Sequence, residues 1–249
     1  MNDFSKFFNR HFEIKTNVDR EIQEESFKMR YQVYCLERGM KSSEGFTRCR
    51  ERDEFDANAL HGIVQHRDSH RTMGTVRLVR SRHNIFGQRF PLEEAFPSLL
   101  REHGLNDRIL PRATTAEISR LAISKISQQD LPQPGGEQAL SRAGGYFNGR
   151  CYPLVTFGLF VALMRLSARH DITHWLAIME PSLLRLLSRF GIAFQRIGGV
   201  VDFHGRRQPC YGRVADIRAR VRNVERDLFD LAEHHVHRVS PMLPERAAC

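Results

Sequence analysis

The sequence AEISRLAI at residues 116–123 predicts a strand that carries a carboxylate and a guanidinium three residues apart. Its β-branched and aliphatic residues are typical of a strand, and charges inside such a strand are costly unless they are paired. Strand alternation places Glu117 and Ser119 on one face and Arg120 on the other. Glu117 and Arg120 share a face only if a β-bulge intervenes, and bulges are common beside active sites. The alternative is an edge strand with ordinary surface charges.

A second charged strand precedes this one in the chain. The sequence GTVRLV at 74–79 follows the strand sequence HGIVQ at 61–65, and a polar turn at 67–71 separates them. Two strand patterns joined by a short polar turn predict a β-hairpin. Arg77 therefore lies inside an apolar strand, as Arg120 does.

The composition fits a globular protein with a substantial core. The chain has 249 residues, of which 41% are hydrophobic and 27% charged. The net charge of +9 predicts an acidic partner, such as nucleic acid, an anionic membrane surface or an acidic protein. The arginines are spread along the chain rather than gathered in one tail, which argues against a disordered nucleic-acid-binding arm.

Cysteine usage and hydropathy indicate a cytoplasmic protein. The five cysteines form no C-x-x-C pair, so we expect neither a zinc site nor a disulfide framework. The N-terminus lacks the charged and apolar regions of a secretory signal. The most apolar stretch, 151–166, contains Thr156, Gly158 and Arg165 and is too short to span a bilayer.

The first half of the chain contains two further charged motifs. Asp19 is a candidate N-cap of a helix that ends near residue 38. Arg30 and Tyr34 are four residues apart and share one face of it, although a surface helix with a long arginine would look the same. The acidic sequence ERDEFD at 51–56 suggests internal pairing with arginine, and the alternative is a solvated turn.

The second half alternates helices and strands. Residues 127–150 are rich in glycine, glutamine, serine and proline and predict a long loop. We expect one mixed α/β domain over 1–249, with a core at about 17–216 and a C-terminal helix and tail at 217–249. No GxGxxG, Walker A or G-x-S-x-G motif occurs. The expected helices are 91–100, 152–170, 181–190 and 218–236, and the expected strands are 117–123, 172–178, 192–197 and 210–214.

Together the charged motifs resemble the acyl-homoserine-lactone synthases. The order and the local spacings match from about residue 22 to about residue 215. The motifs are Arg30, Tyr34, E-x-D-x-x-D at 51–56, G-x-x-R-L at 74–78 and E-x-S-R-L at 117–121. The sequence is more similar to the N-acyl amino acid synthases, and most similar to the acyltransferases associated with exosortase/PEP-CTERM systems. That closer match includes MRYQVYC at 29–35, EISRLAIS at 117–124 and HGRR at 204–207.

This resemblance implies an α/β (α+β) fold of the GNAT acyltransferase type, with a central mixed, twisted sheet flanked by helices. The C-terminal helix would be an extension of that fold. The implied reaction transfers an acyl chain from a phosphopantetheine thioester to an amine. Parallel strands, here 118–123 and 172–178, would splay apart and bind the pantetheine arm through their backbone.

The resemblance also implies roles for the charged residues. Glu117 would accept a proton from the amine, directly or through a water. A backbone N–H beside Arg120 or Leu121 would stabilise the oxyanion. The catalytic set is therefore Glu117, Arg120 and Arg77, and the predicted substrate-binding set is Arg30, Tyr34, Glu51, Asp53, Asp56, Ser119 and Leu121.

A buried charge network is expected around the acceptor. Arg77 and Arg120 would pair with Asp53, Asp56 and Glu117. The helix carrying Arg30 and Tyr34 would be mobile, close over the amine and bind its carboxylate. The alternative is a structural salt-bridge network that shapes the fold without touching substrate.

The expected donor is acyl carrier protein rather than coenzyme A. Residues 124–130 lack the Arg/Gln-x-x-Gly-x-Gly/Ala pyrophosphate signature of coenzyme-A-binding relatives. The basic charge of the chain would steer an acidic carrier protein. Arg185 and Arg189 resemble the docking face of the lactone synthases, and an ordinary solvated helix face explains them equally well.

Apolar residues of the second half are candidates for an acyl tunnel, although methionine and aromatic residues at helical spacing are more often plain core. No metal and no permanently bound cofactor is expected. The candidate tunnel residues are Phe160, Met164, Trp175 and Met179.

Two departures from the lactone synthases favour an amino acid as the acceptor over S-adenosylmethionine. Only Tyr31 and Tyr34 stand where that family carries an aromatic triad, and the helix from Arg218 has no counterpart in its compact members. An N-acyl amino acid product could associate with a membrane surface. The alternatives are autoinducer synthesis from S-adenosylmethionine and a basic nucleic-acid-binding regulator, against which the embedded Arg77 and Arg120 count.

Overall fold

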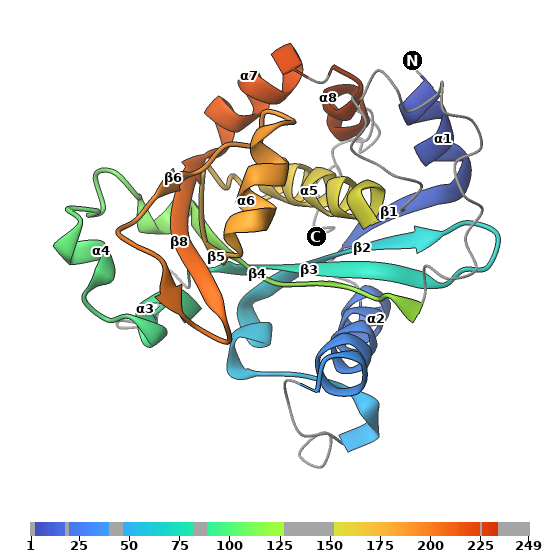
Figure 1. The fold of residues 1–249 in the computed structure, drawn as a ribbon, viewed down its shortest axis with the longest axis horizontal. Coiled ribbons are helices and arrows are strands. Elements are labelled where there is room, and N and C mark those ends of the chain that lie inside the picture. The colour runs from blue at the N-terminus through green and yellow to red at the C-terminus, as the bar shows by residue number, and fades with distance from the viewer. Residues whose placement is uncertain are drawn as a thin grey trace, which may run out of the picture.

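The computed structural model describes residues 3–17, 20–39, 47–81, 89–126, 152–224 and 226–233 (Figure 1). Eight strands form the sheet, with β1-β2-β3-β4-β5-β8-β6 as neighbours and β7 pairing with β8. The strands are β1 Phe12–Asn17, β2 Ala59–His66, β3 Thr72–Arg80, β4 Thr115–Ile123, β5 His174–Met179, β6 Gln195–Arg196, β7 Val201–Asp202 and β8 Arg206–Arg213. The α-helices are α1 Asp3–His11, α2 Arg20–Tyr31, α3 Pro91–Ala95, α4 Leu99–Glu102, α5 Tyr152–Arg169, α6 Pro181–Ser188, α7 Val214–Val224 and α8 Arg226–Glu233.

The sheet is antiparallel except at one position. The predicted hairpin is present as β2 and β3, and β3 then pairs antiparallel with β4. β4 and β5 are parallel, and α5 lies between them in the chain order. This mixed sheet with flanking helices confirms the predicted GNAT-like fold.

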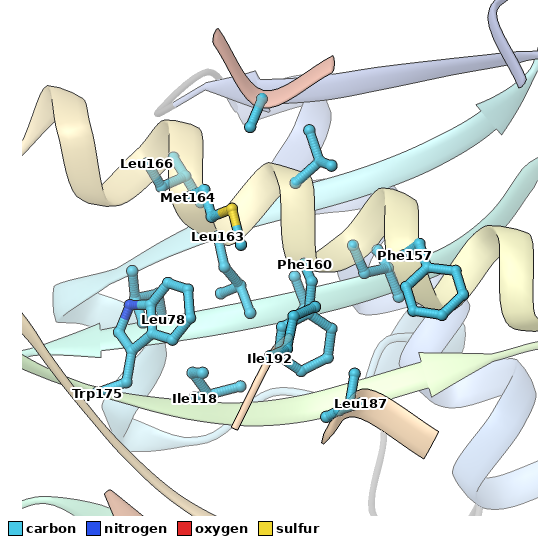
Figure 2. Close-up of a cluster of buried hydrophobic side chains, with 14 of the residues drawn as sticks. Leu78, Ile118, Phe157, Phe160, Leu163, Met164, Leu166, Trp175, Leu187 and Ile192 are labelled. Atoms are coloured by element: carbon cyan, nitrogen blue, oxygen red, sulfur yellow. The ribbon is translucent and has the colours of Figure 1, made fainter. Parts of the chain in front are cut away.

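One face of the sheet is covered by α5 (Figures 1 and 2). Alternate residues of the strands point to it, such as Leu78 on β3 and Ile118 on β4, and both pack into one apolar cluster with α5. Gly62 permits the close approach of α5, because a Cβ there would lie 2.7 Å from the Cβ of Ala162. The cluster extends to Trp175 and to α6 (Figure 2).

The opposite face is covered by α2, which contacts β2, β3 and β4 (Figure 1). The residues of β3 that point this way include Thr75 and Arg77, both fully buried. This layer is therefore polar, whereas the layer under α5 is apolar.

Several boundaries differ from the sequence expectations. The residues after α1 form β1, whose Phe12 and Ile14 alternate with Glu13 and Lys15 and pair with β2. The helix expected to end near residue 38 becomes a π-helical turn at Gln32–Glu37. The strand expected at 192–197 is only the two-residue β6, because only Gln195 and Arg196 pair with β8.

The C-terminal extension comprises the helices α7 and α8, which lie on either side of residue 225 in the sequence. α8 packs against α5 and α1. The expected loop at 127–150 and the tail after residue 233 lie outside the described residues. Among the described helices, none combines the length and the apolar character that crossing a membrane requires.

Candidate active site

Two parallel strands part at the centre of the sheet. β4 and β5 pair only as far as Ile118 and Ala177, whereas β4 continues to Ile123 and β5 to Met179. A cleft of about 440 Å³ occupies the opening. Its lining comprises Tyr34, Arg38, Asp53, Phe55, Arg77, Pro91, Glu94, Ala95, residues 117–121, Ile178, Met179, Glu180, Leu183, Phe203, His204 and Arg207.

β4 carries a bulge beside this cleft. Arg77 of β3 lies opposite Ser119, but Thr75 lies opposite Ala122, so β4 has one extra residue in this interval. Arg120 has a φ of +51°, a left-handed conformation that is uncommon for residues with a side chain. The irregular backbone therefore lies where the two parallel strands separate.

The bulge reverses the alternation of side chains along β4. Ala122 packs on the α2 face and Ile123 in the core under α5, the reverse of uninterrupted alternation from Ser119. Ser119 and Arg120 consequently both reach the α2 face, where Ser119 meets Arg77 and Arg120 meets carboxylates. Glu117 and Arg120 thus share a face, which the sequence allowed only with a bulge.

Three arginines and three carboxylates form a charge-balanced network between the sheet and α2. Arg30 is fully buried, donates through Nε to Glu51, and donates through Nη1 to Asp56 at 2.7 Å. A second bond joins Arg30 Nη2 to Asp56 Oδ2 at 3.1 Å. The members are Arg30, Arg77, Arg120, Glu51, Asp53 and Asp56.

The strand arginines complete this network. Arg77 donates to Asp53 and, at 2.8 Å, to Asp56. Its Nε donates to Ser119 Oγ at 3.0 Å. Arg120 Nη2 donates to Asp53 Oδ2 at 2.7 Å. The expected internal pairing of the acidic sequence with arginine is therefore present in the structure.

A local capping box fixes two of the acids. Asp53 is the N-cap of a 3₁₀ helix at Glu54–Asn58, and its side chain accepts from the Phe55 N–H at 3.1 Å. The Asp56 carboxylate accepts in return from the Asp53 N–H at 2.8 Å. These reciprocal bonds hold both carboxylates toward the arginines.

Pairing outweighs burial in setting the ionisation of these acids. Burial raises the pKa of Asp56, but hydrogen bonds and charge from Arg30 and Arg77 lower it far below its ordinary value. The pKa of Asp53 is also lowered, since Arg77 and Arg120 overcome the effect of burial. Burial lowers the pKa of Arg77, whereas Asp53 and Asp56 raise it above its ordinary value.

Glu117 has a different environment from the other carboxylates. Its side chain is buried and lines the cleft, and Oε2 accepts a hydrogen bond of 2.8 Å from the Leu92 N–H. Burial raises the pKa of Glu117 to about 8, against the lowering influence of that bond and of Arg77. The expected pairing of Glu117 with the arginines is wrong, because its recorded partner is the backbone at the start of α3.

Tyr34, one of the predicted substrate-binding residues, lines the cleft. Its hydroxyl donates to the Leu121 carbonyl at 3.3 Å and so contacts the strand just after the bulge. Burial raises its pKa above the ordinary value. Ser119 and Leu121 also line the cleft.

Arg30 does not occupy the predicted substrate-binding position. It is fully buried beneath the cleft, is absent from the cleft lining among the described residues, and is bound by Glu51 and Asp56. Its guanidinium therefore supports the acids instead of receiving a substrate carboxylate. Spacing along a helix placed Arg30 and Tyr34 on one face but could not tell which of them reaches the cleft.

The proposed acyl tunnel is mostly core. Phe160 and Met164 of α5 and Trp175 of β5 are buried in the core between α5 and the sheet (Figure 2) and do not line the described cleft. Trp175 donates through Nε1 to Ser167 at 2.9 Å, which satisfies its polar atom inside the core. Met179 alone of the four lines the cleft, because it follows the point where β5 leaves β4.

The cleft also contains residues for which the sequence motifs predict no role. The open end carries Arg38, Glu94 and Glu180, and Arg207 forms an ion pair with Glu180 at 2.5 Å. His204 belongs to the HGRR sequence that carried part of the resemblance, so that motif was the available signal. Arg185 and Arg189 are exposed at α6 and its C-cap, and Leu183 of the same helix lines the cleft.

Comparisons with known proteins agree with this geometry. Residues 29–130 match the family model described as the acetyltransferase (GNAT) domain. The fold is similar to the acyl-homoserine-lactone synthase LasI, with a TM-score of 0.56, 20% identity, and coverage of 82% of this chain and 90% of LasI. Comparison with curated protein sequences gives no match.

Two further structures are similar at low identity. The coenzyme-A-dependent acyl-homoserine-lactone synthase BjaI, solved with S-adenosylmethionine and isopentyl-CoA, has a TM-score of 0.55 and 17% identity over 89% of this chain and 87% of BjaI. FeeM, an N-acyl amino acid synthase from uncultured soil microbes, has a TM-score of 0.51 and 12% identity over 84% of this chain and 94% of FeeM.

The partial family match and the similar structures together show a GNAT-like fold. The strands that carry the charged motifs, β3 and β4, lie wholly inside the matched segment.

Proposed function

We propose that this protein transfers a fatty acyl group from an acyl carrier protein thioester to the amine of an amino acid. The observation that carries the proposal is the open end of β4 and β5, where a buried carboxyl, Glu117, and a strand bulge at Arg120 face one cleft. A cleft that combines open strand edges with a proton acceptor suits attack of an amine on a thioester.

The open strands would hold the phosphopantetheine arm. Beyond Ile118, β4 has no partner residue in β5 among the described strands. An extended amide-containing arm can bond to such an edge as an added strand does. Its thioester would then lie beside Glu117 and the bulge.

In the proposed reaction, the amine nitrogen attacks the thioester carbonyl carbon. The new C–N bond forms, the C–S bond breaks, and the electron pair leaves with the phosphopantetheine thiolate. Glu117 accepts the proton that the amine loses, directly or through a water. A pKa of about 8 suits this step, because a base works best when its pKa lies near the working pH.

The bulge would stabilise the developing oxyanion. Arg120 and Leu121 lack a regular one-to-one partner in β3, and pairing with β5 has already ended at Ile118. A backbone N–H at this position could therefore point into the cleft as a fixed donor. The Tyr34 hydroxyl and the arginine–carboxylate network would hold the bulge in place.

The acceptor and the acyl chain would occupy opposite walls of the cleft. Arg38 is exposed, lines the cleft, and replaces the buried Arg30 as the proposed partner of the acceptor carboxylate. The acyl chain would lie along Ile118, Met179 and Leu183, which are apolar and line the other side.

Two features support a carrier protein as donor. Arg185 and Arg189 are exposed near the cleft wall contributed by Leu183, where an acidic carrier protein could dock. The sequence after β4 also lacks the pyrophosphate signature of coenzyme-A-binding relatives. Membership of the exosortase/PEP-CTERM-associated acyltransferases remains part of the proposal, and it is supported by the HGRR sequence, whose His204 and Arg207 line the cleft.

The test is an in-vitro assay with purified protein, a range of acyl carrier protein thioesters and acyl-CoA thioesters, and amino acids as acceptors. Mass spectrometry should detect N-acyl amino acids together with stoichiometric release of thiol. S-Adenosylmethionine is included as a competing acceptor, so a lactone product would replace the amino acid in the proposal. No acyl product from any donor and acceptor pair would contradict the acyltransferase proposal.

A further inference from the structure

We propose that His11, His66 and Asp68 form a binding site for a divalent transition-metal ion of the zinc type, separate from the cleft. The donor atoms of these three side chains all lie within 4.8 Å of one another. None of the three lines the cleft between β4 and β5.

The fold brings the three residues together from two connections. His11 ends α1 directly before β1, and His66 ends β2 directly before the turn that contains Asp68. The backbone fixes this junction, since the Arg67 N–H donates to the His11 carbonyl at 2.9 Å. The His11 and His66 rings are nearly parallel, with an interplanar angle of 5° and centroids 6.3 Å apart.

Both imidazoles carry a nitrogen without a partner among the described residues. His66 is 7% exposed, and its Nε2 has no hydrogen-bond partner; His11 Nδ1 is likewise buried and unpartnered. A buried polar atom without a partner is costly unless something binds it. A cation between the rings would satisfy both nitrogens.

The other ring nitrogen of His66 already has a suitable neighbour. Its Nδ1 lies 3.0 Å from Ser69 Oγ and also accepts from the Ser69 backbone N–H at 3.4 Å. Metal binding at Nε2 would place the ring proton on Nδ1, where the Ser69 hydroxyl can accept it. That tautomer leaves Nε2 free as a metal ligand, which is the arrangement that orients metal-binding histidines.

The chemistry of the donors defines the class of ion. Two imidazoles and one carboxylate suit zinc and similar transition metals better than magnesium or calcium. Neighbouring nitrogen ligands on zinc lie about 3.3 Å apart, so Asp68, which is exposed in the turn, would move inward to close the site. A fourth position would be left for water.

The test is calorimetric titration of the full chain with zinc chloride, repeated with cobalt chloride and visible absorption spectroscopy. All proteins carry His234→Gln, His235→Gln and His237→Gln, because the sequence HHVH at 234–237 could bind zinc independently. One zinc ion per chain is expected, with cobalt bands typical of low coordination number.

Three substitutions probe the ligands and one serves as a matched control. Asp68→Ala, His11→Gln and His66→Asn should each weaken zinc binding at least about tenfold, since loss of an outer-shell partner alone costs about 10–100-fold. His70→Asn changes an exposed histidine of the same hairpin turn and should leave the affinity unchanged. Asp68→Ala lies at the surface, so it remains informative if His66→Asn does not fold.

Absence of one-to-one zinc binding would overturn the proposal. Equal zinc affinity in the parent, Asp68→Ala and His11→Gln proteins would overturn it as well. Because the readout is binding and not acyl transfer, neither result depends on the proposed enzymatic function.

Discussion

The two faces of β3 bury neighbouring residues by opposite means. Leu78 points toward α5 and joins a continuous apolar cluster, whereas Arg77 points toward α2 and is equally buried among carboxylates. The apolar face is stabilised by area removed from water, which tolerates varied packing partners. The polar face is stabilised only if each charge finds its partner.

This difference between the apolar and the charged face of the sheet explains the position of the cleft. A network of paired charges fixes donor and acceptor positions, as the bonds from Arg77 to Ser119 and from Arg120 to Asp53 do beside the bulge. The apolar face supplies the free energy that such an arrangement requires. The charged wall of the cleft therefore lies on the α2 side, and the supporting core lies under α5.

The largest expected effect comes from removing one buried charge. Arg77→Met leaves Asp53 and Asp56 short of a partner and should lower the free energy of unfolding by about 3–5 kcal/mol. Leu78→Ala on the other face should lower it by about 2–5 kcal/mol by leaving a cavity. Urea denaturation measures both.

The two variants should differ in the acyl-transfer activity of the molecules that do fold. Leu78→Ala should keep acyl transfer per folded molecule, whereas Arg77→Met should lose it because the wall of the cleft is disordered. In a double-mutant cycle, Asp56→Asn should cost less in the Arg77→Met background than in the parent. Strictly additive costs would show that the two residues are not energetically coupled.

Ionisation of Glu117 should lower the stability of the protein as the pH rises. Its pKa is raised from 4.5 to about 8 by burial, so the folded state keeps a proton that the unfolded state releases above pH 4.5. The free energy of unfolding therefore falls as pH rises toward 8, by about 2–4 kcal/mol. Glu117→Gln should remove this fall, and the difference between the two proteins, measured by urea denaturation from pH 5 to 8, isolates it.

His61 should lower the stability of the protein at acidic pH. Burial lowers its pKa to about 4, so the unfolded state binds a proton below pH 6.5 that the folded state refuses. Stability should therefore fall as pH drops from 6.5 toward 4. His61→Gln should flatten this acidic side, and an unchanged acidic slope in that variant would rule out His61 as its source.

Substitutions in the cleft and in the core should affect the acyl chain length of the product differently. Leu183→Trp fills the cleft wall at a half-buried position and should shift products to shorter acyl chains with a stability change near 1 kcal/mol or less. Phe160→Leu changes a core residue of α5 and should lower the free energy of unfolding by about 1 kcal/mol without changing the acyl chain length of the product. Mass spectrometry of the products measures the acyl chain length for both variants. A change of chain length in Phe160→Leu would place the acyl-binding site in the core instead of the cleft.

The smallest expected effect on the fold comes from the proposed docking surface. Arg185→Glu with Arg189→Glu should change stability by less than about 0.5 kcal/mol, because both positions are exposed. The value of kcat/KM for acyl carrier protein should fall about tenfold and become less sensitive to salt. The rate with a small pantetheine thioester serves as the control and should not change.

The sequence predicted the parts of the molecule that follow simple periodicity. The hairpin, β4, β5 and α5 carry strand or helix patterns that the structure repeats. The sequence allowed Glu117 and Arg120 to share a face only if a bulge interrupts the strand. The register between β3 and β4 shows that bulge. The short β1 was missed because a weak alternation becomes a strand only through pairing with β2.

The site was predicted by residue type better than by position. Arginines and acids at motif spacing do pair, but only the tertiary packing decides that Arg30 is buried and that Glu117 binds the Leu92 N–H. Helical spacing likewise cannot separate the core residue Phe160 from the cleft residue Leu183. Arg38 carried no pattern of its own and became a candidate only through its place on the cleft wall.

The central claim is that Glu117 is the proton acceptor of an acyl transfer in the cleft. The most direct measurement is the single-turnover rate from pH 6 to 9 for the parent, Glu117→Gln and Glu94→Gln, which changes a second carboxylate of the same cleft. Ionisation of the acceptor amine affects all three proteins equally, so the ratio of parent to variant reports the carboxyl itself.

For Glu117→Gln, this ratio should rise with pH up to about 8, the raised pKa of Glu117, and then reach about 10²–10⁴. For Glu94→Gln it should stay near one. A ratio for Glu117→Gln that is near one, or that does not change with pH, would contradict the account.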